Sequence, residues 1–168
     1  TSRLDKSTAL KFALETVVAL CREGEESNPH QALKCCKTAL KFASDNKEVS
    51  DVLMLQAYCL LETAQTNTAI QTFKESFRSN PENYIPLAHL GNIYASDSKL
   101  LQTLEYDSRQ SDTGIPSAKL ILGHTYNALN RPENAAAEFE SYYNNKMREG
   151  YFANKGFYLI LGTTYEEY

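Results

Sequence analysis

The sequence predicts an all-α fold in which antiparallel helix pairs stack as a solenoid. Its 168 residues include only seven glycines and five prolines, and these lie between apolar runs, as is typical of helices joined by short turns. A small residue followed three positions later by a large one also recurs at spacings of 34, 32 and 39 residues. Recurrence at this period is typical of helical repeat proteins. With 42% hydrophobic and 23% charged residues, the chain can bury a core.

The charge balance argues against a nucleic-acid partner. Seventeen basic residues are outnumbered by 21 acidic ones, which gives a net charge of −4, whereas a nucleic-acid binder usually presents a basic face. No apolar run approaches the roughly 18 residues that a membrane span needs. We therefore expect neither nucleic-acid binding nor direct membrane insertion.

The first predicted repeat covers residues 7–46. A helix from about Ser7 to Arg22 is expected, and a second helix should begin near Pro29, with Asn28 as its N-cap. The apolar face of the first helix comprises Leu10, Leu14, Val17 and Cys21. The inward positions of the second helix are Ala32, Cys36 and Ala39.

The repeats at 50–83 and 116–150 carry the pattern most fully. In each, a small residue in the first helix is followed twelve positions later by an alanine and sixteen positions later by a phenylalanine. Turn signals at Gln65 to Asn67 and at Asn130 to Glu133 separate the two helices. The residues that define the pattern are Ala57, Ala69, Phe73, Gly91, Tyr94, Gly123, Tyr126, Ala135, Phe139, Gly162 and Tyr165.

Two parts of the chain depart from this pattern. In the repeat at 84–115, Thr103 and Asp107 stand where alanine and phenylalanine are expected, and polar residues follow Tyr106, so we expect a short second helix. The spacing from Gly123 to Gly162 predicts an extended helix or a loop around residues 144–150. A partial repeat at 151–168 has no second helix, so we expect the chain to be a fragment of a longer protein or a partner to cover that end.

The motifs "LGNIY", "LGHTY" and "LGTTY", with "AIQTF", "AAAEF" and "SNPEN", resemble the tetratricopeptide repeat (TPR) family over roughly residue 7 to the C-terminus. The resemblance implies a right-handed α-solenoid with about four and a half repeats in a single domain, 1–168. It also implies that Gly123 and Ala135 face one another where the two helices of a repeat cross. Closer backbone contact there would offset the roughly 1 kcal/mol that a glycine costs inside a helix.

The resemblance further implies that the first helix of each repeat lines a concave groove. Asp51 and Ala95 also fall on this stripe, which is largely apolar and should accept an amphipathic helix or an extended peptide. Asn92 alone matches the Lys, Asn and Arg set that clamps chaperone C-termini in some TPR proteins, and Gly156 and Ile160 stand where cations are needed, which argues against such a clamp. The expected groove residues are Met54, Tyr58, Leu61, Ile85, Ala88, Asn92, Ser117, Leu120, His124 and Asn127.

Catalytic and metal-binding motifs are absent from the sequence. It contains no GxSxG elbow, no phosphate-binding glycine loop and no HExxH. Cys35 and Cys36 are adjacent and would point about 100° apart on a helix, a poor geometry for a shared metal, even with His30 nearby. We expect no cofactor, no metal, and reduced thiols in a cytoplasmic or nuclear protein.

These observations predict a non-enzymatic scaffold that binds a peptide or helix of another protein. A structural subunit that stacks on a neighbour or on a second copy, as a homo-oligomer, is the alternative, and packing of the groove against the same protein also stays open. A helical-repeat RNA binder is disfavoured by the acidic charge.

Overall fold

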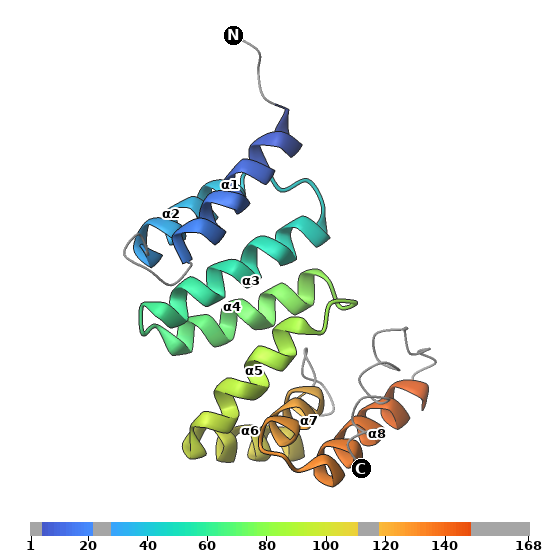
Figure 1. Ribbon diagram of the computed structural model, residues 1–168. Helices are drawn as coiled ribbons and strands as arrows, with labels where there is room; N and C mark the ends of the chain where they lie inside the picture. The colour runs from blue at the N-terminus through green and yellow to red at the C-terminus, as the bar shows by residue number, and fades with distance from the viewer. Residues whose placement is uncertain (1–4, 22–27, 111–117, 149–168) are drawn as a thin grey trace. The chain divides into compact units, whose positions relative to one another are not determined.

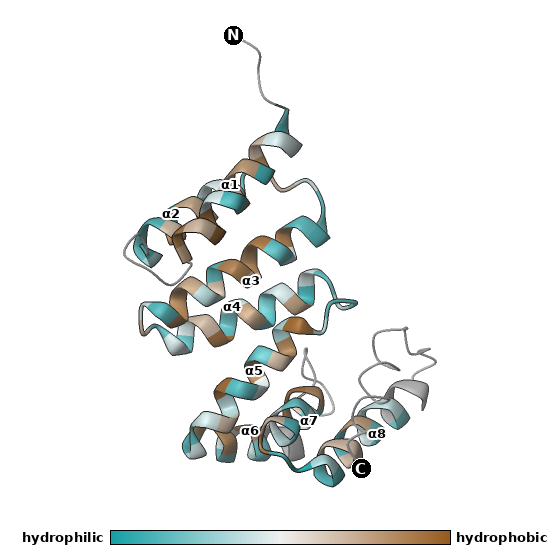
Figure 2. Cartoon of the chain, viewed as in Figure 1, coloured by the Kyte–Doolittle hydropathy of each residue, from teal (hydrophilic) through white to brown (hydrophobic). Residues whose placement is uncertain are grey.

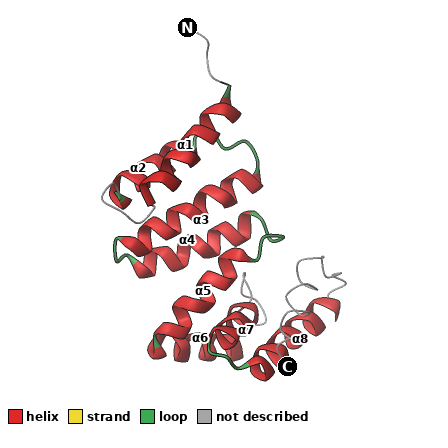
Figure 3. Cartoon of the chain, viewed as in Figure 1, coloured by secondary structure: helices red, strands yellow, loops and turns green. Residues whose placement is uncertain are grey.

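The structure is a computed structural model that describes residues 5–21, 28–110 and 118–148. These residues form helices and loops and contain no strand (Figure 1, Figure 3), which confirms the all-α class. The chain divides into two compact units, Thr1–Asn80 and Pro81–Tyr168. The division falls between the second and third predicted repeats. That the two units form one domain stays a prediction.

The first unit contains four helices, and every helix in Figure 2 carries both hydrophobic and hydrophilic residues. Contacts join α1 to α2, α2 to α3 and, most extensively, α3 to α4. The helices are α1 (Lys6–Cys21), α2 (Pro29–Ala39), α3 (Asn46–Glu62) and α4 (Thr66–Ser79). Chain neighbours therefore pack as successive pairs, as the short turns predicted.

Side-chain caps fix where α2 and α3 begin. The Asn28 side chain accepts a 3.0 Å hydrogen bond from the Gln31 backbone N–H, and Pro29 occupies the first turn of α2. Asp45 accepts likewise from Glu48, at 2.8 Å, while the Glu48 carboxylate accepts from the Ser44 N–H at 2.7 Å. These bonds satisfy backbone donors that a helix start leaves without partners. The predicted start of α2 is confirmed.

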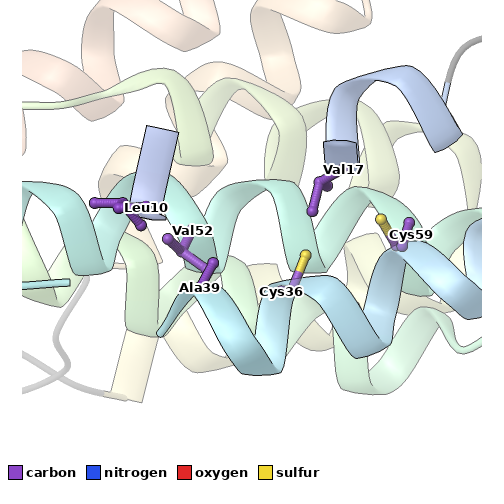
Figure 4. Packing of buried hydrophobic residues seen from close by; sticks show 7 residues of the cluster. Leu10, Val17, Cys36, Ala39, Val52 and Cys59 are labelled. Atoms are coloured by element: carbon purple, nitrogen blue, oxygen red, sulfur yellow. The ribbon is translucent and has the colours of Figure 1, made fainter. Parts of the chain in front are cut away.

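The core of the first unit has two layers. Between α1, α2 and α3 lie Leu10, Val17, Ala32, Cys36, Ala39, Val52 and Cys59, most of them labelled in Figure 4. Between α3 and α4, Ala57, Ala69 and Phe73 have no exposed surface. The buried Ser76 hydroxyl donates to the Ser50 carbonyl at 2.8 Å. Both polar groups are therefore hydrogen-bonded within the core.

The second unit also contains four described helices. In it α7 contacts each of the other three, most extensively α5 and α8. The helices are α5 (Ile85–Ser96), α6 (Ser98–Gln110), α7 (Ala118–Ala128) and α8 (Pro132–Arg148). The prediction of a short helix after Leu100 is wrong, because α6 continues through the polar residues to Gln110. Of the two alternatives expected around residues 144–150, an extended helix or a loop, the structure shows the helix as far as Arg148.

Both α3 and α7 end in the same kind of turn. Ala64 (φ 57°) and Asn130 (φ 54°) adopt the left-handed conformation, which reverses the chain after a helix. In each turn the next N–H donates to a carbonyl five residues back, Gln65 to Leu60 at 2.9 Å and Arg131 to Tyr126 at 2.8 Å. The sequence predicted the first of these turns at Gln65–Asn67. In the structure the turn lies slightly earlier, because α4 already begins at Thr66.

Gly91 and Gly123, the two glycines among the described residues, both lie where helices meet. A Cβ on Gly91 of α5 would lie 2.7 Å from the His124 backbone carbon of α7. A Cβ on Gly123 would meet the Phe139 ring of α8, with Cδ1 at 2.7 Å. Gly123 therefore lies at the contact between the two helices of its pair, as expected, and Ala135 of α8 is fully buried, while a direct Gly123–Ala135 contact stays a prediction.

The remaining residues of the repeat pattern have mixed outcomes. Tyr94 is buried, while Tyr126 is half-buried and donates a 3.0 Å hydrogen bond from its hydroxyl to Glu105 of α6. Tyr126 thus contacts α6, the helix that precedes α7. Gly162, Tyr165 and the partial repeat at 151–168 lie outside the described residues, as do Gly156 and Ile160.

These contacts predict that alanine at either glycine destabilises the second unit. Gly91→Ala and Gly123→Ala should each lower the free energy of unfolding by about 1–3 kcal/mol through overpacking, although alanine is the better helix former. Phe139→Leu should reduce the penalty at Gly123 by removing ring atoms, yet leave the penalty at Gly91, where the obstacle is backbone. Urea unfolding of the single variants, and of each glycine variant combined with Phe139→Leu, gives the energetic coupling of Phe139 to Gly91 and to Gly123.

The matched control is Asn92→Ala, at the exposed neighbour of Gly91 on α5. It should leave stability unchanged or slightly raised. A Gly91→Ala protein as stable as Asn92→Ala would contradict the close approach of α5 and α7.

Candidate functional site

The predicted groove residues of the first unit form a stripe on α3. Met54, Tyr58 and Leu61 are all half-buried and recur at helical spacing on one side of the helix. Their inner surfaces are held by neighbouring side chains while the rest stays accessible. We call these three residues the α3 stripe. It is an apolar surface carrying one phenolic hydroxyl.

The stripe is held in place by the pair formed by α3 and α4. The Tyr58 and Phe73 rings meet edge to face with centroids 5.6 Å apart, a favourable aromatic geometry. Burial raises the pKa of Tyr58 above its usual value, so its hydroxyl stays protonated at neutral pH. An aromatic side chain fixed in this way loses little conformational freedom when a partner binds.

One end of the stripe carries the half-buried carboxylate of Asp51. Burial raises the pKa of this group, and nearby Lys47 opposes the shift. The carboxylate is partly withdrawn from water, so a cation or an N–H donor brought by a partner would be favoured there.

The predicted groove residues of α5 differ in exposure. Ile85 has 54% of its surface exposed, Asn92 is exposed and Ala88 is half-buried. Ile85 and Asn92 are therefore accessible to a partner of the second unit.

The predicted groove residues of α7 differ in burial. Leu120 has no exposed surface, which corrects the expectation that it lines an open groove. His124 and Asn127 are half-buried, and Ser117 lies outside the described residues.

His124 is held at the contact between α5, α7 and α8. Its ring meets the Phe139 ring edge to face, with centroids 5.3 Å apart, and its backbone lies against Gly91. The Nε2 atom is buried without a hydrogen-bond partner. Burial therefore lowers the pKa of His124 to about 4, because nothing stabilises the charged form. Its geometry makes it part of the helix contact.

Within residues 5–21, 28–110 and 118–148 no three His, Cys, Asp or Glu side chains are grouped to hold a metal ion. In the same ranges no helix is both long and apolar enough to cross a membrane.

Two features of the first unit were missed by the sequence-based prediction. The α1–α2 groove, of about 290 Å³, is lined by Ala13, Thr16, Gln31, Lys34, Cys35 and Thr38. Phe12, beside it in sequence, is 63% exposed. The thiols of Cys21, Cys36 and Cys59 come together from three helices. Helical spacing placed Cys21 on the apolar face of α1, but nothing in the sequence paired that face with α3.

Comparison of the chain with protein-family models, characterised proteins and solved structures gave no match.

The environment of His124 predicts that the second unit loses stability in acid. The folded pKa, about 4, lies below the unfolded value of about 6.5, so between these values the unfolded chain binds more protons. This contribution is complete above the unfolded pKa and is lost as pH falls toward 4. The free energy of unfolding, measured in urea, should be about 2 kcal/mol lower at about pH 5 than at about pH 7.5 through the contribution of His124.

His124→Gln is the comparison variant, because it cannot titrate. Burial also lowers the pKa of His89 in the same unit, so only the difference between the parent protein and the variant reports His124. Equal pH dependence in the two proteins would show that the imidazole is not held in its neutral form.

Proposed function

We propose that this chain is a non-enzymatic protein–protein interaction scaffold of the TPR type, which binds a peptide or an amphipathic helix of a partner. The observation that carries the proposal is the α3 stripe, an accessible apolar surface fixed on a tightly packed helix pair. In this proposal the helix pairs form a right-handed solenoid of about four and a half repeats. The protein acts in the cytoplasm or nucleus.

Two helix pairs that share the same internal design support the repeat. In α3–α4 and in α7–α8 a small buried residue, Ala57 or Gly123, is followed seven positions later by a residue with positive φ, Ala64 or Asn130. Each second helix also buries an alanine and a phenylalanine at matching offsets. Two pairs built alike within separate units favour a repeated element over an irregular bundle.

The chemistry of the α3 stripe defines the partner. Met54 and Leu61 supply apolar contact without a charge to be desolvated, and the Tyr58 ring adds apolar area. Such a surface suits a helix that presents apolar residues at helical spacing. A basic residue of that helix lies near Asp51, since the partly desolvated carboxylate favours a cation.

A displayed peptide library, selected on the intact protein, supplies the test ligand. The selected peptide should lose affinity at least tenfold when Met54 and Leu61 are both changed to glutamate, because apolar area then meets buried charge. Fluorescence anisotropy measures the dissociation constant, and circular dichroism checks that helicity is unchanged. Tyr58 is left intact because its ring packs on Phe73.

Gln71→Glu is the matched control, since it adds charge at an exposed position of the adjacent helix α4. It should bind the selected peptide as the parent protein does. Equal affinity of the double variant and this control would remove the α3 stripe from the proposal.

A second candidate is a structural subunit that associates with a neighbour or with another copy. The exposure of Phe12, at 63%, and of Val18, at 41%, on α1 favours it, because large exposed side chains on one helix are typical of association surfaces. Sedimentation over a range of protein concentrations tests this candidate. Association of the parent protein that is lost in Phe12→Glu supports it. A parent protein that stays monomeric throughout excludes a homo-oligomer.

A further inference from the structure

Three cysteine thiols from three different helices meet in the core of the first unit. Cys21 is the last residue of α1, Cys36 lies in α2 and Cys59 lies in α3. Figure 4 shows Cys36 and Cys59 in one layer with Val17 of α1. All three thiols are free. Their arrangement is independent of the α3 stripe and of the proposed function.

The closest pair is Cys21 and Cys59. Their Sγ atoms are 2.9 Å apart and share a hydrogen bond in which either thiol can donate. A disulfide requires about 2.0 Å between the sulfurs. A small movement of the two side chains therefore brings the sulfurs to bonding distance. The two residues are 38 positions apart in sequence, so a bond between them would close a long loop.

The two thiols differ in access. Cys21 is half-buried, whereas Cys59 has no exposed surface. An oxidant from solution therefore meets Cys21 first, and Cys59 is placed to react with the product. Cys35 neighbours Cys36 in sequence but lines the α1–α2 groove.

We propose that Cys21 and Cys59 form a redox site, which a peroxide converts into an intramolecular disulfide joining the end of α1 to α3. The Cys21 thiolate attacks one peroxide oxygen, the O–O bond breaks, and the departing hydroxide takes up the thiol proton as water. The Cys59 sulfur then attacks the sulfenic sulfur of Cys21, the S–S bond forms, and a second water leaves with the Cys59 proton. Two thiols are oxidised and one peroxide is reduced.

The surroundings make this oxidation slow and the product stable. Burial, with the hydrogen bond to Cys59, raises the pKa of Cys21 to about 12. The hydrogen bond to Cys36 and burial raise the pKa of Cys59. Few thiolates exist at neutral pH, so brief exposure to peroxide leaves the pair reduced. Once formed, the disulfide restricts the unfolded chain and stabilises the unit.

The test exposes the reduced full chain to excess hydrogen peroxide for hours, beside a dithiol peptide that confirms the oxidant is active. Intact mass should fall by two hydrogens, and alkylation in denaturant should reach two cysteines in place of four. Non-reducing digestion should yield the peptide that joins Cys21 to Cys59. The melting temperature should rise by several degrees and fall back when a reductant is added.

Two serine variants make the assignment specific. Cys35→Ser removes a thiol at the groove and should form the same disulfide with the same rise in melting temperature. Cys21→Ser should show no rise. A cross-link between any other pair, or four alkylated cysteines after the dithiol peptide has been oxidised, would overturn the proposal.

Discussion

The close approach of α7 to its neighbours is the contact on which the second unit depends. Gly91 has no side chain, so the backbone of α5 reaches the backbone of α7 at His124. Gly123 leaves room on α7 for the Phe139 ring of α8. Each glycine costs helix propensity, and the dispersion attraction between closely packed helices offsets that cost. One helix is thereby surrounded, which is why its leucines have so little exposed surface.

The same contact has a chemical consequence. Because α5 and α8 cover His124, the imidazole loses water without gaining a partner for Nε2, so a titratable group is kept neutral inside a helix interface. The described part of the first unit uses no glycine in this role. There Ala57 and Ala69 are the small buried residues between α3 and α4. Three cysteine thiols occupy the space where α1, α2 and α3 meet. Small or soft side chains therefore take the place of glycine.

Much of the local structure could be predicted from sequence, while the helix partners could not. Asn28 followed by Pro29 specified a helix start, because those residues satisfy or remove backbone donors at that point. Periodicity identified which side of each helix is apolar, but not which neighbour covers it. Leu120 was therefore expected in a groove and is buried, and the approach of Gly91 to His124 of α7 was not predicted. The length of α6 was underestimated because the polar residues after Tyr106 were taken as a helix stop, whereas the helix continues through them to Gln110.

A backbone-to-backbone contact can be observed directly. In the nuclear Overhauser spectrum of the labelled protein, the Gly91 Hα protons should show cross-peaks to the Hβ protons of His124, because the position of a Gly91 Cβ lies 2.8 Å from the His124 Cβ. Cross-peaks from Gly91 to residues of α6, with none to His124, would contradict this account of how the helices are joined.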